Sequence, residues 1–251
     1  MTPILECRNL CFSYHSAEGE TEALRDISFT VFPGTFTAIV GPSGCGKSTL
    51  LSLICGLIPP ERGEIISDNT HIGYMLQRDH LLEWRTVYEN AILGLEMQHQ
   101  CTKENLGFVR QMLTDYGLAD FADAKPSSLS GGMRQRAALI RTMAIHPELL
   151  LLDEPFSALD YQTRLEVADD IGSLIVQSGK TAILVTHDLS EAISLADRVI
   201  VLTRRPARIC CILPLDFEEE REGKRLTSLE RRNSSAFPSY FQKLWKEVRQ
   251  L

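Results

Sequence analysis

The stretch GPSGCGKST, Gly41 to Thr49, decides the fold of this chain. It lies between the apolar run Phe36 to Val40 and an apolar, helix-like segment that begins at Leu50. Strand, glycine-rich loop and helix follow one another in this order in phosphate-binding loops, where backbone N–H groups and the positive end of the helix dipole face an anion. The sequence therefore predicts a loop that holds the phosphates of a nucleotide.

The side chains of this loop match the needs of a bound triphosphate. Gly41, Gly44 and Gly46 keep the loop free of bulk, so that the main chain can approach the phosphates. Lys47 can place a positive charge on the β- and γ-phosphates, and the Ser48 hydroxyl can ligate Mg²⁺. The predicted nucleotide-binding set is completed by Pro42, Ser43, Cys45 and Thr49.

Composition sets the broad class of the protein. The 251 residues are 44% hydrophobic and 24% charged, enough for one domain or a domain with an inserted lobe. The longest aliphatic run, Leu149 to Leu152, is too short to span a bilayer, and the first residues lack the pattern of a secretion signal, so we expect a cytoplasmic protein. A formal net charge of −7 argues against broad nucleic-acid binding. From Arg204 onward, basic and acidic residues are interleaved, which favours a solvated surface over contact with anionic lipid headgroups.

The cysteines are seven in number and lack the CxxC spacing of metal sites. We expect reduced, partly buried thiols. Cys45 differs because it lies inside the glycine-rich loop, where oxidation or alkylation would block nucleotide entry.

The order of elements predicts an α/β fold. Alternating residues in Leu5 to Tyr14 and Leu24 to Val31 indicate antiparallel strands joined by a turn-rich link. Leu149 to Asp153 and Thr181 to Thr186 read as buried strands separated by an amphipathic helix over residues 162–177, the alternation that gives a parallel sheet.

Three further segments complete this organisation. Short strands are predicted at residues 64–67 and 71–77. Residues 86–128 show a helical pattern and are predicted to form an inserted lobe. Residues 214–251 form a predicted C-terminal helical tail, in which FPSYFQKLWKEV is a terminal amphipathic helix.

Two carboxylates end a buried strand in the run LLLLDEP, Leu149 to Pro155. Open α/β sheets place their ligands at this edge. Asp153 can hold the Mg²⁺ shell together with Ser48, and Glu154 can orient or deprotonate the water that attacks the γ-phosphate. The alternative is that Asp-Glu-Pro merely ends a strand and opens a turn.

A second anion-binding helix N-terminus is predicted at LSGGMRQR, Leu129 to Arg136. Ser130 is a good N-cap residue, and Gly131 and Gly132 expose backbone N–H groups. A head-to-tail homodimer explains why one chain has two phosphate sites: the Ser130 end of one copy closes over ATP held by Lys47 of the other. The simpler alternative is a capped helix after a loop.

With these motifs in this order, the chain resembles the ATP-binding subunits of ABC transporters over nearly its whole length. The resemblance implies a P-loop NTPase (RecA-like) parallel-sheet core with an N-terminal antiparallel β subdomain and an inserted α-helical subdomain, residues 1–251 being one ATP-binding domain. Gln77 matches a residue that contacts Mg²⁺ and the attacking water, His187 the switch histidine at the γ-phosphate, and Tyr14 the aromatic residue that stacks on adenine. The loop that crosses between subunits corresponds to Ser157, Ala158, Leu159 and Asp160.

Function follows from this resemblance as an expectation. The cofactors are ATP and Mg²⁺, the catalytic residues are Glu154, His187, Gln77 and Lys47, and Ser48, Gln77 and Asp153 contact the metal. ATP binding clamps two copies together, and hydrolysis lets them part, which drives transmembrane permease subunits. The protein is expected to be peripheral on the inner face of the cell membrane.

The segment RDHLLEWRTVYENAILGLEM after Gln77 resembles the group of nitrate, sulfonate and taurine importers, which includes importers of thiamine-precursor pyrimidines. Importers of this kind also use an extracytoplasmic substrate-binding protein, which meets the permease. The residues expected at the permease groove are Asp79, Leu82, Trp84 and Arg85. Glu83 replaces a usual proline and Met133 a common glutamine. The alternatives are an exporter motor and a soluble, non-transport ABC ATPase.

Overall fold

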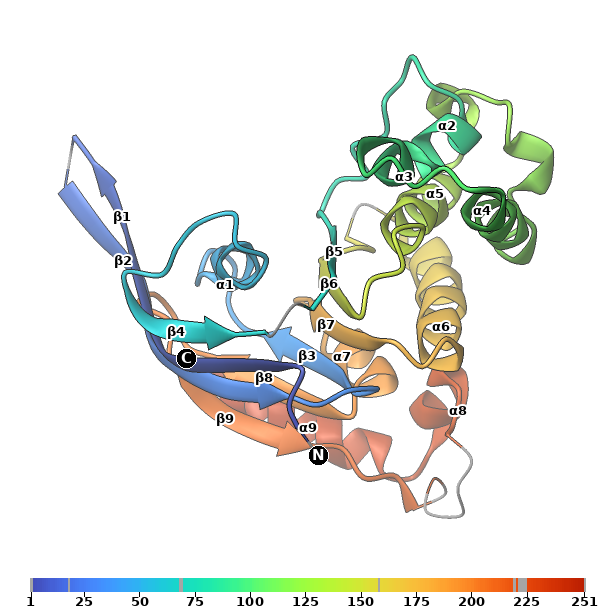
Figure 1. The fold of residues 1–251 in the computed structure, drawn as a ribbon. Helices are drawn as coiled ribbons and strands as arrows, with labels where there is room; N and C mark the ends of the chain where they lie inside the picture. Colours follow the sequence, from blue (N-terminus) through green and yellow to red (C-terminus); the bar gives the residue numbers. More distant parts are fainter. Residues whose placement is uncertain are drawn as a thin grey trace. The chain divides into compact units, whose positions relative to one another are not determined.

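The computed structural model describes residues 2–17, 19–67, 70–157, 159–218, 220 and 225–250. The chain forms two compact units, Met1–Thr70 together with Gly172–Leu251, and His71–Ile171. Figure 1 shows the elements of both. None of the helices in the described ranges combines the length and the apolar character that a bilayer crossing requires.

The first unit begins with an antiparallel sheet in the order β2-β1-β4. Its strands are β1 (Leu5–Ser16), β2 (Gly19–Val31) and β4 (Arg62–Ile66). The antiparallel pairing predicted from the alternating residues is confirmed. The predicted link is shorter than the sequence indicated, because His15 pairs with Glu20 and Ser16 with Gly19, which extends both strands into the hairpin.

Four strands of the same unit belong to the six-stranded sheet that carries the glycine-rich loop. They are β3 (Phe36–Val40), β7 (Thr181–Val185), β8 (Arg198–Leu202) and β9 (Ile209–Pro214). β3 pairs in parallel with β7 on one side and with β8 on the other, and β9 runs antiparallel to β8. Every residue of β3 and β7 is buried, which explains their largely apolar sequences.

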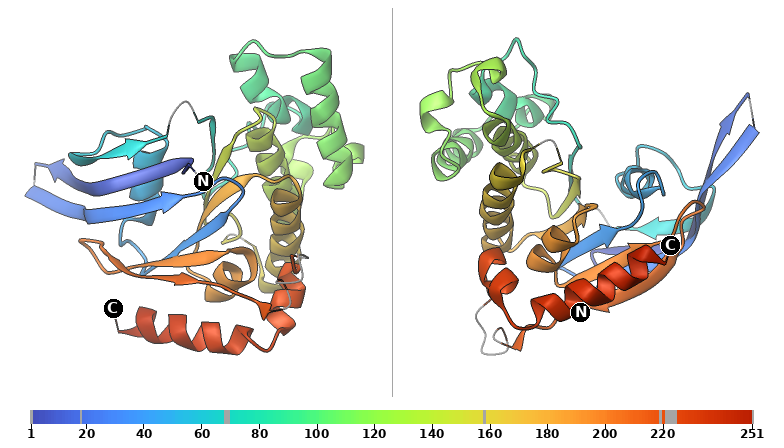
Figure 2. Two further views of the ribbon diagram at one scale, coloured as in Figure 1. Left: turned by 60° about the horizontal axis from the view of Figure 1, so that its bottom comes forward. Right: turned by 180° about the vertical axis from the view of Figure 1, so that it is seen from behind.

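The helices of this unit are α1 (Lys47–Ile54), α7 (Leu189–Leu195), α8 (Ser228–Asn233) and α9 (Phe237–Arg249). The helix expected from Leu50 begins three residues earlier, at Lys47, so the lysine itself lies in its first turn. The terminal amphipathic helix is confirmed as α9. α7 contacts β3, β8, α8 and α9, and Figure 2 shows α8 and α9 in red.

Arg231 fastens the C-terminal tail to the rest of this unit. Its side chain is 1% exposed and lies 4.9 Å from the centre of the Phe217 ring. The guanidinium donates two hydrogen bonds to Glu220, at 2.8 and 2.9 Å, and one to the carbonyl of Ala196 at 2.6 Å. A charge this deeply buried persists because it is paired and hydrogen-bonded. The tail is therefore an integral part of the unit.

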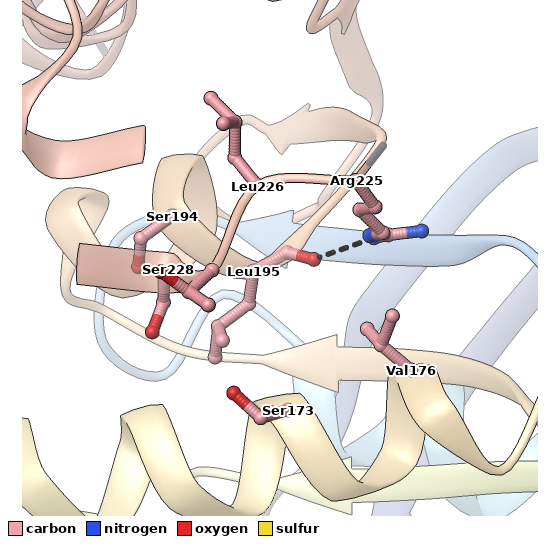
Figure 3. Close-up of a pocket in the computed structure, with 9 residues that line it drawn as sticks. Ser173, Val176, Ser194, Leu195, Arg225, Leu226 and Ser228 are labelled. Carbon is pink, nitrogen blue, oxygen red and sulfur yellow. Dashed lines mark hydrogen bonds between the residues drawn. The ribbon is translucent and has the colours of Figure 1, made fainter. Parts of the chain in front are cut away.

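A small cavity of about 90 Å³ lies beside this anchor. Its lining includes Ser173, Ser194 and Ser228 (Figure 3). Arg225 crosses its edge and donates a hydrogen bond to the carbonyl of Leu195 at 3.1 Å. The same guanidinium is ion-paired with Asp197 at 2.9 Å, so its charge is already compensated within the protein.

The second unit is a helical bundle beside two parallel strands. The strands are β5 (Ile72–Met75) and β6 (Leu149–Asp153), and they pair in register from Ile72 with Leu149 to Met75 with Leu152. The helices are α2 (Val87–Ala91), α3 (Leu93–Met97), α4 (Lys103–Asp115), α5 (Gly131–Met143) and the start of α6 (Tyr161–Gln177), with 3₁₀ turns at Ala119–Phe121 and Pro126–Ser128. α2, α3 and α4 all contact α5. The predicted lobe over residues 86–128 thus lies inside a larger unit.

Candidate nucleotide-binding site

The glycine-rich loop joins β3 to α1 in the predicted order. The Lys47 side chain is 5% exposed and folds back over the loop, with its ammonium donating hydrogen bonds to the carbonyls of Gly41 at 2.9 Å and Pro42 at 3.1 Å. Gly46 has φ +125°, and a Cβ there would lie 2.9 Å from Leu24 Cδ2. A side chain at this position would need both a strained backbone and displaced packing, so the loop requires glycine here.

Tyr14 is anchored to the first turn of α1. Its hydroxyl is hydrogen-bonded to the Thr49 hydroxyl at 2.8 Å, and its ring meets Phe12 edge-on, with the centroids 5.0 Å apart. The Tyr14 side chain is still 45% exposed. The structure thus fixes an aromatic ring beside the loop while leaving part of it accessible, as an adenine-stacking residue requires.

Arg205 contacts the loop from the turn between β8 and β9. Its guanidinium donates a hydrogen bond of 2.7 Å to the carbonyl of Gly44. Arg204 and Arg205 line a cavity of about 440 Å³ together with Pro42, Ser43, Gly44 and Cys45. The interleaved charges after Arg204 predict a solvated surface rather than this contact. Two consecutive arginines shortly after an apolar strand are its sequence signal.

His187 lies at the sheet edge where the glycine-rich loop begins. β3 and β7 are parallel neighbours, with Ile39 paired with Val185, so the residues after each strand emerge at the same edge. The Asp188 carboxylate caps α7 by accepting a hydrogen bond from the Ser190 N–H at 2.7 Å. His187 precedes this cap and is exposed, at the same edge of the sheet from which the glycine-rich loop emerges.

The second unit brings Gln77, Asp153 and Glu154 together. β5 and β6 end side by side, and the Gln77 amide donates a hydrogen bond of 3.4 Å to the Glu154 carboxylate. The Tyr74 hydroxyl donates one of 3.2 Å to Asp153, whose side chain is buried. Glu154 has φ +44°, a conformation that costs a non-glycine residue about 1–3 kcal/mol and concentrates at functional sites.

Ser130 caps α5, as predicted. Its hydroxyl accepts a hydrogen bond of 3.4 Å from the Met133 N–H. A Cβ on Gly131 would lie 3.0 Å from Leu159 Cδ2, and one on Gly132 would lie 3.0 Å from Val167 Cγ2. The two glycines therefore also permit close packing inside this unit, a role that the sequence does not indicate.

The segment between β6 and α6 is held by short-range hydrogen bonds. The Ser157 hydroxyl donates to the carbonyl of Glu154 at 3.0 Å, and the Asp160 carboxylate accepts from the Thr163 N–H at 3.1 Å. Leu159 is buried. Ala158, the remaining member of the predicted subunit-crossing loop, lies outside the described residues.

The segment after Gln77 is bonded to α5. The Arg134 guanidinium contacts the Asp79 carboxylate through two hydrogen bonds, at 2.9 and 3.0 Å. Burial raises the pKa of Asp79, but the hydrogen bonds and charge of Arg134 outweigh it, so the pKa lies below its usual value. Arg141 donates to the carbonyls of Asp79 at 2.6 Å and His80 at 2.8 Å. The start of this segment is therefore held to α5.

Trp84 projects from the middle of the same segment. Its side chain is 73% exposed, while buried Asn90 holds the surrounding backbone by accepting from the Leu82 N–H at 2.7 Å and donating to the Leu82 carbonyl at 3.1 Å. Arg85 is ion-paired with Glu96 at 2.5 Å. A large aromatic side chain is thus exposed to solvent on a hydrogen-bonded segment of backbone, which is typical of an interface anchor.

Parallel strands, a glycine-rich loop with a buried lysine and carboxylates at a strand end together define a P-loop nucleoside triphosphatase. The model for the ABC transporter family matches residues 24–157. The chain belongs to the ABC transporter family, as an ATP-binding subunit with ATPase chemistry. The expectation drawn from the motifs is confirmed at this level.

Similar proteins agree with this assignment. The ABC transporter ATP-binding protein YtlC of Bacillus subtilis is 41% identical over 98% of this chain and 96% of its own length. The aliphatic sulfonates import ATP-binding protein SsuB 2 of Agrobacterium fabrum is 43% identical over 91% of this chain and 84% of its own. A dimeric post-hydrolysis structure of the ATP-binding cassette MJ0796, bound to ADP and Pi, matches with a TM-score of 0.74 at 30% identity, over 84% of this chain and 99% of that one.

We expect Arg205→Ala to weaken ATP binding several-fold, because the change removes one exposed hydrogen bond that braces the loop, worth about 1 kcal/mol. Arg208→Ala is the matched control. It removes a cation from the same turn. Arg208, however, pairs with Asp26, at 3.9 Å, rather than with the glycine-rich loop. Fluorescent-nucleotide titration compares the two variants. Equal affinity for both would contradict a bracing role for Arg205.

Proposed function

We propose that this protein is the ATP-hydrolysing motor of an importer for a small solute such as nitrate, a sulfonate, taurine or a thiamine-precursor pyrimidine. The observation that carries the proposal is that each compact unit holds a helix N-terminus suited to phosphate, α1 with Lys47 and α5 with Ser130. The likeness to a sulfonate import protein supports the choice of substrate class. The chain's sequence differs from the usual importer pattern at Glu83 and Met133. Neither residue has a role in the proposed hydrolysis of ATP.

The nucleotide is held mainly by the glycine-rich loop. We assign adenine stacking to Tyr14 and contact with the β- and γ-phosphates to Lys47 and the loop N–H groups. Mg²⁺ fits the remaining donors, because Ser48, Gln77 and Asp153 offer hydroxyl, amide and carboxylate oxygens, the ligands that a hard cation prefers. Bound there, Mg²⁺ would neutralise charge on the β- and γ-phosphates.

Glu154 performs the proton chemistry. Its carboxylate accepts a proton from the attacking water, and the hydrogen bond from the Gln77 amide fixes its orientation. His187 donates a hydrogen bond to the γ-phosphate oxygens that gain charge. Because phosphoryl transfer depends mainly on positioning and charge stabilisation, closure of the site completes the catalyst.

Closure requires a second copy of the chain. In a head-to-tail dimer, Ser130, Gly131 and Gly132 of one copy meet the γ-phosphate on the loop of the other, giving two equivalent sites. Ser157, Leu159 and Asp160 lie at the crossing between the copies. The dimeric arrangement of the MJ0796 cassette supports this model.

Coupling to a permease runs through the segment after Gln77. Trp84 inserts into the permease, and Asp79 transmits the contact to α5 through the paired hydrogen bonds from Arg134. Ser130 lies at the N-terminus of that same helix. A permease that changes shape would therefore move the group that closes on ATP.

We expect Trp84→Ala to abolish capture of the permease while ATP binding stays unchanged, because a buried aromatic anchor contributes about 2–4 kcal/mol to an interface. Trp245→Ala is the matched control, since Trp245 is also exposed, at 53%, but lies on α9 of the other unit. Co-purification with the cognate permease measures the effect. Capture of the permease by Trp84→Ala at wild-type yield would remove Trp84 from the interface.

The neighbouring genes distinguish import from export. An importer requires a permease together with a secreted binding protein, and the pocket of that binding protein identifies the solute. An exporter, the second candidate, would lack the binding protein.

A further inference from the structure

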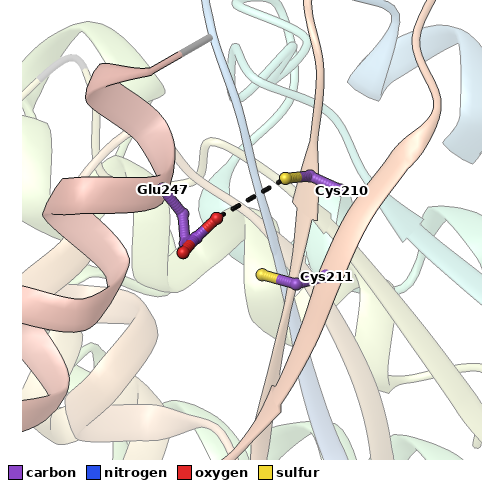
Figure 4. Close-up of side chains that lie close together, drawn as sticks. All are labelled: Cys210, Cys211 and Glu247. Atoms are coloured by element: carbon purple, nitrogen blue, oxygen red, sulfur yellow. Dashed lines mark hydrogen bonds between the residues drawn. The ribbon is translucent and has the colours of Figure 1, made fainter.

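Cys210, Cys211 and Glu247 form a cluster that the transport function does not use. The two cysteines lie on β9, and Glu247 lies on α9, the terminal helix (Figure 4). One ligand atom from each residue lies within 4.8 Å of the others. The Cys210 thiol donates a hydrogen bond of 3.7 Å to a Glu247 oxygen. Two sulfur atoms and a carboxylate therefore converge on one point.

A β-bulge brings the two adjacent thiols to the same side. Consecutive side chains of a regular strand point to opposite faces. Here Val201 pairs with Cys211 and Leu202 pairs with Ile209, which leaves Cys210 as the extra residue of β9. Because a bulge interrupts the alternation and re-aims side chains, both sulfur atoms can face Glu247. The sequence contains the Cys-Cys pair, but it contains no sign of this bulge.

The chemistry of the cluster selects a cation. Thiolates favour thiophilic metals such as Zn²⁺, and a carboxylate oxygen is a common additional Zn²⁺ ligand. Three protein ligands leave one tetrahedral position for water. Mg²⁺, the metal of the ATPase reaction, prefers oxygen donors and is a poor match for sulfur.

The two thiols must lose their protons to ligate a metal, and the repulsion among the three groups opposes this loss. Burial, and after it the neighbouring Cys210 and Glu247, raise the pKa of Cys211 to about 11. The pKa of Cys210 is raised by burial and then by the charge of Glu247. Lys243, one turn before Glu247 on α9, has its ammonium 5.7 Å from the centre of the Tyr240 ring. A bound cation would remove the repulsion among the three ligand groups.

We propose that Cys210, Cys211 and Glu247 form a binding site for a thiophilic divalent cation of the Zn²⁺ class, which fastens α9 to β9. The site is independent of the proposed transport function. It joins strand and helix residues that are 36 positions apart in the sequence, Cys211 and Glu247. Loading the site would stabilise the C-terminal tail.

The test uses the full-length, untagged, reduced protein titrated with Zn²⁺, and with Co²⁺ as a spectroscopic probe of thiolate ligation. We expect one equivalent of tightly held metal and a sulfur-to-cobalt charge-transfer band. Cys210→Ser should weaken binding by at least about 100-fold, since changes that only reorient a ligand already cost 10–100-fold. Glu247→Gln should weaken it by at least about 10-fold. Cys101→Ser, which removes an exposed thiol elsewhere, should bind like wild type.

Thermal unfolding provides a second measurement. Zn²⁺ at 100-fold excess over its Kd should raise the Tm of the wild-type protein by about 5 °C or more, and leave that of Cys210→Ser unchanged. Cys210 is exposed, so this substitution tests the site without disturbing the core. Wild-type and Cys210→Ser proteins with the same Zn²⁺ affinity, or binding that is lost in Cys101→Ser instead, would overturn the proposal.

Discussion

Replacement of Glu154 by Gln is expected to abolish most ATP hydrolysis while leaving ATP binding intact. The amide has the size of the carboxylate and can still accept the hydrogen bond from Gln77, which is 3.4 Å long in the structure. It cannot take a proton from water. Loss of a general base lowers turnover by about 10²–10⁴-fold. Phosphate release under saturating ATP and Mg²⁺ measures this loss directly.

The same variant should accumulate as an ATP-bound dimer, because the closed state can no longer be opened by hydrolysis. Gel filtration with ATP and Mg²⁺ separates this dimer from the monomer. Glu148→Gln is the matched control, as it makes the same chemical change just before β6, at an exposed position. A Glu154→Gln protein that stays monomeric and hydrolyses ATP at the normal rate would refute both the base assignment and the closure model.

The parts of the site that follow from local chemistry could be predicted from the sequence. The glycine-rich loop is specified by its own residues, and buried β6 ends at Asp153 because an apolar run stops at a carboxylate. Gln77 and Glu154 could be matched one by one through the family resemblance. The structure adds that they are hydrogen-bonded, since β5 and β6 end together.

Contacts between residues that are far apart in the sequence could not be predicted. Arg205 reaches Gly44 because the β8–β9 turn comes back to the loop, and residues 44 and 205 share no sequence pattern. The Asp79–Arg134 pair depends on how α5 packs, 55 residues later. In each case the partners are ordinary polar residues, and only the tertiary arrangement gives them a specific role.

Lys47→Ala is expected to weaken ATP binding by about 10- to 100-fold, because charge-assisted hydrogen bonds are worth about 1.5–3 kcal/mol each. The substitution also removes the bonds from the ammonium to Gly41 and Pro42, which hold the loop closed on itself. Lys103→Ala, at the exposed start of α4, controls for the loss of one positive charge. Equilibrium binding of labelled ATP gives both affinities.

Mixing two defective subunits then tests where the second phosphate contact comes from. Ser130→Asp keeps a good N-cap for α5 but places a negative charge against the γ-phosphate, and Ser130→Asn keeps the cap without the charge. With ATP held near the Kd of the wild-type protein, Lys47→Ala and Ser130→Asp should each be nearly inactive alone. In a mixed head-to-tail dimer, one site combines the intact Lys47 of one copy with the intact Ser130 of the other, so an equal mixture should recover about a quarter of wild-type activity. If each subunit formed its site alone, the mixture would recover nothing.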